Sequence, residues 1–378
     1  MSITKVPEKI RMILWGQAAG RCEYEGCNER LFLDHLTKAQ FNTSYIAHIV
    51  ADSPDGPRGD AVLSDKLKAD ISNLMLMCDR HHRLIDKEDV PGHPVARLTA
   101  MKLKHEQRID ILADISEDKR SHILLYGARI GEQDSPLSYR EARVAMVPDR
   151  YPAETNPISI GLVNSSIPDG ADMYWAVEEA QMRTLLNQRV RPLIGGGKIS
   201  HISVFALAPQ PLLILLGSLL TDIPAIEVYQ RRREPLTWRW DEKPESWSYD
   251  IVEPEVAEGD PALVFSLSGT VTERRITNVL GPNVSIWQVS IPNQHNDFLV
   301  SRPQASEFRV QMRALMNRIK LRHGEAASIH VFPVMPVSLA VDFGRILMPK
   351  ADLPLVVYDR NQATGEFTRA LNINARPS

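Results

Sequence analysis

The stretch MCDRHHRLID, residues 77–86, places one of the chain's three cysteines three residues ahead of two adjacent histidines. Neighbouring side chains of an α-helix point about 100° apart, so two consecutive imidazoles on a helix that starts near Cys78 cannot bind the same ion. His81 can face Cys78, whereas His82 faces a different direction. Asp86 follows His82 at i+4, where its carboxylate can orient the imidazole through a hydrogen bond. The stretch therefore predicts that one short segment serves two neighbouring sites.

The other two cysteines, Cys22 and Cys27, form a Cys-x4-Cys pair that complements Cys78-x2-His81. Thiolates and an imidazole arranged in two such pairs are typical ligands of tetrahedral zinc. Three cysteines cannot form a disulfide framework in a chain of 378 residues. Three unrelated buried cysteines are the alternative, but this leaves unexplained why none lies in the last 300 residues. We therefore predict a structural Zn²⁺ bound by Cys22, Cys27, Cys78 and His81.

Length and charge set the broad class of the protein. A chain of 378 residues is too long for one ordinary core and suggests two or three domains. The formal net charge of −3 argues against a protein that coats nucleic acid by charge alone, so contact with DNA must be local or need several chains. We find no secretory pattern and no apolar run of the roughly 20 residues that a membrane span needs. We therefore expect a cytoplasmic protein without a membrane partner.

Two helical segments frame a turn-rich first domain. The spacing of apolar residues predicts helices over residues 7–19 and 94–114. Between them lies SPDGPRGD (53–60), whose prolines and glycines are typical of a loop. The polar run ISEDKRSH then leads out of this part of the chain. We therefore place the first domain at 1–118 and a linker at 119–140.

The rest of the chain contains an internal duplication. Residues 199–240 align with residues 327–368, and each copy predicts a strand, a proline-bearing turn, an apolar helix containing a glycine, and a second strand. The second strands end in Tyr229 and Tyr358. Strands that alternate with helices at this spacing favour parallel βαβ units. The duplication therefore predicts two similar α/β halves.

We place this α/β domain at 141–378, with halves of about 141–250 and 251–378. Ligands of such sheets bind beyond the carboxyl ends of the strands, so the loops there should line a crevice that the halves share. These loops offer small residues for close approach, aromatic rings that could stack on a base, and arginines that could pair with phosphate. The candidate ligand-binding residues are Trp175, Gln210, Arg231, Ser266, Ser268, Gly269, Thr270, Arg274, Arg302 and Phe332.

Three polar residues of the first domain follow one another in a recognisable order: His48 in YIAHIV, Asn73 in SNLMLMC and His82 in CDRHH. With the cysteine pairs, this order resembles the HNH, or ββα-metal, nucleases over about residues 10–110. The resemblance implies that His48 ends a strand and activates water as a general base. It implies that His82 binds a catalytic divalent ion, Mg²⁺ or another metal. Asn73 would position the strand of His48 or contribute an oxygen.

One position departs from the family pattern. Many HNH nucleases carry an acidic or histidine metal ligand immediately before the base, and this chain has Ala47 there. Asp52 and Asp86 are the possible substitutes.

A rival acid–histidine pair, Asp34 and His35 in LDHL, lies close to the first cysteine pair and far from Asn73 along the chain. We therefore prefer His48 as the base. The remaining histidines are expected to be solvated helix or loop residues, namely His93, His105 and His122.

The pattern HISVFALAPQPLLILLGSLL, followed by VYQRRR and a tryptophan, is similar to the SAVED domain, a sensor built of two fused CARF-like halves. A SAVED domain joined to an HNH nuclease resembles the HNH-SAVED effectors of CBASS anti-phage defence over essentially the whole chain. The resemblance implies an α+β HNH domain with structural zinc, followed by an α/β SAVED domain of two CARF- or Rossmann-like halves. It also implies a cyclic di- or trinucleotide ligand, ligand-induced assembly of dimers to tetramers, and cleavage of double-stranded DNA.

Two alternatives are consistent with the same zinc and histidine residues. One is a restriction-type HNH endonuclease whose second half reads modified DNA, although such a reader would be expected on a β-barrel rather than on βαβ units. The other is a non-catalytic zinc module that only docks nucleic acid.

Overall fold

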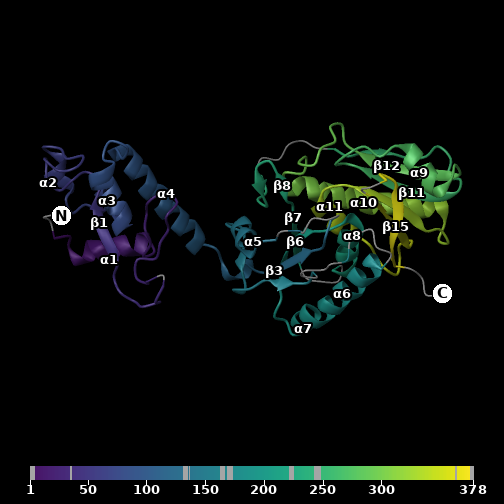
Figure 1. Ribbon diagram of the computed structural model, residues 1–378, viewed down its shortest axis with the longest axis horizontal. Coiled ribbons are helices and arrows are strands. Elements are labelled where there is room, and N and C mark those ends of the chain that lie inside the picture. Colours follow the sequence, from purple (N-terminus) through teal and green to yellow (C-terminus); the bar gives the residue numbers. More distant parts are fainter. Residues whose placement is uncertain are drawn as a thin grey trace. The chain divides into compact units, whose positions relative to one another are not determined.

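The computed structural model divides into two compact units, Met1–Ser116 and Glu117–Ser378, each with its own core (Figure 1). It describes residues 5–34, 36–130, 135, 137–161, 167, 173–220, 225–241, 248–361 and 364–374. Over these ranges, no helix combines the length and apolar character that crossing a membrane requires.

The first unit is built around a two-stranded antiparallel sheet followed directly by a helix. Strand β1 (Ser44–His48) pairs with β2 (Leu74–Cys78) so that Ser44 lies opposite Cys78 and His48 opposite Leu74. All of β2 is buried because its apolar side chains pack on both faces of the sheet. The other elements are α1 (Glu8–Gln17), α2 (Leu63–Leu67), a 3₁₀ turn (Ile71–Asn73), α3 (Asp79–Arg83), a π-helical turn η2 (Leu84–Glu88) and α4 (Val95–Ala113).

The helices of this unit agree with the sequence prediction. Helices α1 and α4 lie where apolar spacing predicts them, within one or two residues. Helix α3 starts immediately after Cys78, whose extended backbone ends the strand. It has a single turn before the chain widens into η2, so the histidine pair and Asp86 lie on two successive helical segments.

The second unit contains two sheets, one in each half of the duplication. The first half has strands in the order β4-β3-β6-β7, with β5 also paired to β3, and all of these pairs are parallel. Its elements are β3 (Arg120–Gly127), α5 (Tyr139–Ala145), β4 (Tyr151–Pro152), β5 (Ile158–Ser159), α6 (Tyr174–Arg189), α7 (Arg191–Gly195), β6 (Ile202–Leu207), α8 (Gln210–Leu219) and β7 (Ile226–Tyr229).

The second half has the strand order β10-β12-β11-β13-β14-β15, in which β11, β12, β13 and β14 are parallel and the two edge strands antiparallel. Its elements are β10 (Asp250–Val252), β11 (Asp260–Ser266), α9 (Glu273–Leu280), β12 (Val284–Ser290), α10 (Arg302–His323), β13 (Ile329–Val334), α11 (Val337–Arg345), β14 (Leu355–Arg360) and β15 (Phe367–Ile373). A short ribbon, β8 (Arg232–Arg233) and β9 (Leu236–Thr237), follows the first half.

The two sheets repeat one topology. The order β5-β3-β6-β7 in the first half corresponds to β12-β11-β13-β14 in the second, with parallel pairing throughout. Helices α8 and α11 each follow a proline of the same backbone conformation, with φ and ψ of −54° and 144° at Pro209 and −55° and 146° at Pro336. The predicted duplication is therefore present in the fold, and α8 and α11 pack against each other between the halves (Figure 1).

The expected linker at 119–140 is wrong over residues 120–127. Residues Arg120–Gly127 form β3, a strand inside the first sheet that pairs with β6 over six residues and is almost entirely buried. The polar residues before it form only a short 3₁₀ turn, Glu117–Lys119. Since the partner strand lies about 80 residues further along the chain, local polarity could not reveal that this segment belongs to the α/β core.

Candidate functional site

The three cysteines and His81 converge in the first unit. One ligand atom from each of Cys22, Cys27, Cys78 and His81 lies within 4.8 Å of the others. The Nδ1 atom of His81 is 3.6 Å from Sγ of Cys22 and 3.3 Å from Sγ of Cys78. The cluster joins the loop after α1 to the end of β2 and the start of α3.

The chemistry of this cluster fits zinc. None of the three cysteines forms a disulfide, and burial raises the pKa of both the Cys22 and the Cys78 thiol. Buried thiolates are therefore costly without a cation, whereas Zn²⁺ binds three thiolates and an imidazole in tetrahedral geometry. The residues present would accommodate that ion.

A second layer of contacts supports His81. The ring of Tyr24 stacks on the imidazole at 4.1 Å between centroids and 8° between planes. The Tyr24 hydroxyl lies 3.0 Å from Nε2 of His93, whose Nδ1–H donates to the Asp89 carbonyl at 2.7 Å.

The histidines expected to be solvated, namely His93, His105 and His122, are instead buried, so that expectation is wrong. A histidine whose apolar edge is packed can serve as an internal hydrogen-bonding group.

His48 occupies the last position of β1 and is buried. Its Nε2 lies 2.9 Å from the Lys68 carbonyl oxygen, and because a carbonyl only accepts, Nε2 carries the proton. In the neutral imidazole, Nδ1 is then the nitrogen with the lone pair that a general base would use.

Asn73 fixes the backbone that follows His48. Its Oδ1 accepts from the N–H of Val50, and its Nδ2 donates to the carbonyl of the same residue, both at 2.8 Å. A further contact of 3.3 Å joins Nδ2 to the Leu67 carbonyl. The sequence allows two roles for Asn73, namely positioning the strand of His48 or contributing an oxygen. These contacts fit the first role.

His82 points away from the cysteine cluster. Its Nε2 lies 3.3 Å from Oδ2 of Asp86, and its ring stacks on Tyr45 of β1 at 5.1 Å and 15°. Burial lowers the pKa of His82 more than the nearby Asp86 carboxylate raises it, so the imidazole is neutral near pH 7, the form that binds metals. The two adjacent histidines are therefore committed to different surroundings.

The possible substitutes for Ala47 are Asp86 and Asp52. Both carboxylate oxygens of Asp86 are engaged, Oδ2 by His82 and Oδ1 by Arg58 at 2.6 Å. Asp52 is half-buried in the loop after β1. Of the rival pair, Asp34 caps a turn by accepting from the backbone and hydroxyl of Thr37, and His35 lies outside the described residues.

A crevice of about 630 Å³ opens in the second unit, beyond the carboxyl ends of β6, β7, β13 and β14. Hydrogen bonds tie its two walls together: Gln210 donates to the Met335 carbonyl at 2.8 Å, and Gln230 accepts from the N–H and hydroxyl of Ser338 at 3.1 and 2.9 Å. The predicted crevice between the halves is therefore present. The lining residues are Ile130, Ser135, Leu207, Ala208, Pro209, Gln210, Gln230, Arg231, Arg233, Ser268, Asn296, Asp297, Pro333, Val334, Met335, Pro336, Val337, Asp359 and Arg360.

Three of the ligand-binding candidates line this crevice, namely Gln210, Arg231 and Ser268. Sequence reasoning missed Arg360, although the duplication contained the signal. Arg231 lies two residues after Tyr229, and Arg360 lies two residues after Tyr358. Each half therefore contributes one arginine from the same place in the fold.

Two of the candidates cannot reach a ligand. Phe332 is fully buried and stacks on Tyr358 at 4.5 Å and 10°, repeating the stack of Phe205 on Tyr229 at 4.4 Å and 15° in the other half. Ser266 is also fully buried, and its hydroxyl accepts from the backbone of Val271. These two assignments are wrong because the residues belong to the core.

The other candidates lie outside the lining. Trp175 packs half-buried against the core, and Arg302 is ion-paired with Glu227 and, at 2.7 Å, with Asp149. Arg274 is exposed on α9. Gly269 and Thr270 follow Ser268 but are not part of the lining, and the Thr270 hydroxyl donates to Gln294 at 2.7 Å.

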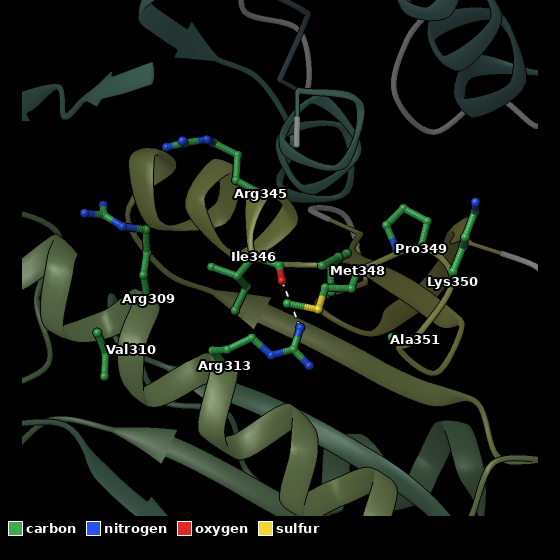
Figure 2. A pocket seen from close by; sticks show the side chains of 10 residues that line it. Arg309, Val310, Arg313, Arg345, Ile346, Met348, Pro349, Lys350 and Ala351 are labelled. Atoms are coloured by element: carbon green, nitrogen blue, oxygen red, sulfur yellow. Dashed lines mark hydrogen bonds between the residues drawn. The ribbon is translucent and has the colours of Figure 1, made fainter. Parts of the chain in front are cut away.

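A larger pocket of about 970 Å³ lies between α10 and the segment after α11 (Figure 2). Figure 2 shows Arg309, Arg313 and Arg345 around it. Asp342 holds Arg309 at 2.7 Å and Arg345 at 3.1 Å, while Asp352 holds Arg313. Arg231 of the crevice is likewise paired, with Glu141 at 3.3 Å. The crevice is the stronger candidate for a ligand because it lies between the halves, beyond the carboxyl ends of the parallel strands.

Two sheets with the same parallel core topology, fused in a single chain around a shared crevice, define a duplicated α/β fold. Residues 182–373, just over half of the chain, match the family model of SAVED, the SMODS-associated and fused to various effectors sensor domain. The chain therefore belongs to the SAVED family, as predicted for its second part.

The solved structures that the chain matches include receptors described as containing a SAVED/CARF domain. The Acinetobacter baumannii Cap4 SAVED/CARF-domain containing receptor with the cyclic trinucleotide 3'3'3'-cAAA is 11% identical, with 78% of this chain and 66% of that chain covered and a TM-score of 0.46. The Moraxella osloensis Cap4 receptor is 10% identical, with 78% and 60% covered and a TM-score of 0.43. The chain thus spans less than two thirds of the length of these receptors. No curated protein matches the chain.

Proposed function

We propose that the protein is an anti-phage effector of the CBASS type, in which a cyclic oligonucleotide binds the second unit and activates cleavage of double-stranded DNA by the first. The observation that carries the proposal is the joining of two features in one chain. One is a SAVED domain with a crevice between its halves. The other is a strand–strand–helix unit that presents His48, Asn73 and His82 beside a Cys₃His cluster.

The crevice has the chemistry to bind a cyclic di- or trinucleotide. Arg231 and Arg360 reach it from opposite halves, so each can pair with one phosphate of a ligand that spans both. The amides of Gln210 and Gln230 and the neighbouring prolines supply hydrogen-bonding groups and apolar surface for bases. The Cap4 receptor is described with a cyclic trinucleotide, and we propose the same class of ligand here.

In the first unit, His48 would remove the proton from the attacking water through Nδ1, since the Lys68 carbonyl holds the proton on Nε2. Asn73 would keep the backbone after His48 in place. His82, neutral and oriented by Asp86, would hold a divalent ion, Mg²⁺ or another metal. When bound, such an ion supplies charge stabilisation at the scissile phosphate. Cys22, Cys27, Cys78 and His81 would hold a structural Zn²⁺.

Activation requires that the ligand favours an active state over an inactive one. A change from mostly inactive to mostly active needs a difference in ligand affinity worth roughly 5 kcal/mol. With a net charge of −3, a single subunit should hold DNA weakly. We therefore propose that the ligand favours an assembly of two to four chains, which brings several nuclease units to one duplex.

The alternatives have less support. The βαβ topology and the SAVED match disfavour a modified-DNA reader in the second unit. A non-catalytic zinc module would need the cysteine cluster only, and would leave the separate arrangement of His48, Asn73 and His82 without a use.

The test uses purified full-length protein, plasmid DNA, Mg²⁺ and a panel of cyclic di- and trinucleotides. We expect degradation that depends on one member of the panel. His48→Ala should abolish degradation while keeping ligand binding, and Arg83→Gln, an exposed position next to His82, should behave like the wild type. Unchanged degradation by His48→Ala, or intact plasmid with every member of the panel, would overturn the proposal.

A further inference from the structure

Arg58 lies in the SPDGPRGD loop and turns its side chain inward, leaving only 6% of it exposed. Its backbone has a φ of +58°, in the left-handed region that non-glycine residues rarely adopt. The loop is compact around it: a Cβ on Gly59 would lie 2.3 Å from the Pro54 carbonyl oxygen, and one on Gly56 would lie 2.6 Å from the Ala51 Cβ. Arg58 therefore combines a strained backbone with a buried, charged side chain.

The guanidinium group of Arg58 bonds to two separate segments. On the side of β1, Nε donates to the Ile49 carbonyl at 2.8 Å and Nη2 to the His48 carbonyl at 3.2 Å. On the side of η2, Nη1 donates to the Ile85 carbonyl and Nη2 to Oδ1 of Asp86, both at 2.6 Å. The planar guanidinium group has a fixed geometry, so it sets the distance between the end of β1 and η2.

These bonds place Arg58 between the two histidines of the proposed reaction. One arm holds the backbone of His48 itself, and the other holds the carboxylate whose second oxygen orients His82. The half-buried Asp86 carboxylate, bridged in this way, cannot rotate without leaving either the guanidinium or the imidazole unpaired, which is costly.

We propose that Arg58 is a positioning residue for DNA cleavage, which fixes His48 relative to His82 without contacting DNA or metal. The inference rests on the proposed function of the first unit. Misplacement of catalytic groups by about 1 Å can cost roughly 100-fold in rate, and loss of a group that orients a metal ligand costs about 10- to 100-fold in metal affinity or activity.

The test compares Arg58→Gln and Arg58→Lys with Arg83→Gln, an exposed arginine of α3 paired with Asp79 at 3.1 Å. The full-length proteins are assayed on plasmid with Mg²⁺ and with 3'3'3'-cAAA, or whichever cyclic di- or trinucleotide activates the wild type. Mn²⁺ binding without DNA is measured by electron paramagnetic resonance. Zinc content and thermal unfolding report whether each variant is folded.

For Arg58→Gln we expect kcat to fall about 100-fold, KM for DNA to stay within twofold, and Mn²⁺ to bind about 10-fold more weakly. Arg58→Lys keeps the charge beside Asp86 but loses the planar guanidinium group, so it should recover part of the Mn²⁺ affinity and little of kcat. If Arg58→Gln does not fold, Arg58→Lys carries the same comparison. Arg83→Gln should match the wild type.

Two outcomes overturn the inference and can be told apart. A folded Arg58 variant with wild-type kcat and wild-type Mn²⁺ affinity removes the inference and leaves the proposed function intact. A wild-type protein that cuts no DNA with any member of the panel removes the proposed function, and this inference with it.

Discussion

Gly217 of α8 and Gly344 of α11 meet each other across the boundary between the two halves. A Cβ on Gly217 would lie 2.0 Å from the Val341 carbonyl oxygen, and a Cβ on Gly344 would lie 2.0 Å from the Ile214 carbonyl oxygen. Each glycine stands eight residues after the proline that precedes its helix. The glycine that the duplication repeats is therefore the point where two equivalent helices cross at backbone contact.

Gly217→Ala should destabilise the second unit by about 1–3 kcal/mol or more, because both helices must move apart to admit one methyl group. Urea unfolding followed by tryptophan fluorescence measures the loss. Gly195→Ala is the matched control, since a Cβ at that helical position meets nothing within 4 Å. Equal stability of the two variants would contradict the close crossing.

Cys78→Ser should remove one bound zinc per chain and lower the thermal stability of the first unit. The reason is that metal binding at such a site contributes directly to folding, by on the order of 10 kcal/mol in zinc-finger peptides. Elemental analysis and thermal unfolding measure both effects, and a strong chelator should reproduce them with the wild type. Full stability in the absence of any bound metal would show that the cluster is only a packed group of thiols.

Arg231→Ala and Arg360→Ala should each weaken binding of the activating cyclic oligonucleotide roughly 10- to 100-fold, because each removes a charge-assisted contact from one wall of the crevice. Isothermal titration calorimetry with the cyclic di- and trinucleotide panel gives the affinities. Arg274→Ala serves as the control because Arg274 is exposed on α9 and outside the lining. A loss confined to Arg274→Ala would place the ligand elsewhere.

The second unit should lose stability as the pH falls from about 6.5 towards 4. Burial, with smaller contributions from Arg150 and Arg345, lowers the pKa of His201 to about 4, and its Nδ1 lies 2.8 Å from the Ser121 hydroxyl. Between these pH values His201 is protonated in the unfolded chain but stays neutral in the folded protein. The free energy of unfolding therefore falls by at most about 1.4 kcal/mol per pH unit.

His201→Asn should flatten this pH dependence. Urea unfolding at pH 7 and pH 5 measures the difference for the wild type and the variant. His295→Asn, at an exposed position, should retain the wild-type difference. An equally steep loss of stability in His201→Asn would assign the effect to other groups.

Local spacing in the sequence was sufficient for part of the candidate site. The pairs Cys22/Cys27 and Cys78/His81 are each close in sequence, and helical geometry alone separates His81 from His82. The repeat likewise predicted the paired sheets, because strand, turn and helix recur in the same order. In these cases the deciding contacts lie within one or two turns of the chain or are repeated along it.

Properties that depend on packing could not be predicted in the same way. Phe332 immediately precedes residues that line the crevice, yet its ring is buried and stacks on Tyr358. His93 is polar and follows a loop, yet its partner Tyr24 lies 69 residues away. Arg58 looks like a loop residue, and only the folded chain shows what its guanidinium joins. Which face of an element is covered is decided by segments far away in sequence.

The crevice has walls that began as copies but no longer match. Gln210 in one half occupies the place of Val337 in the other, and Gln230 occupies the place of Asp359, while the arginines that follow are the same. A cavity formed by two separate identical chains must change on both sides at once. In one polypeptide each wall can change independently. The two different walls could then hold the proposed cyclic oligonucleotide, whose units repeat, in a single orientation.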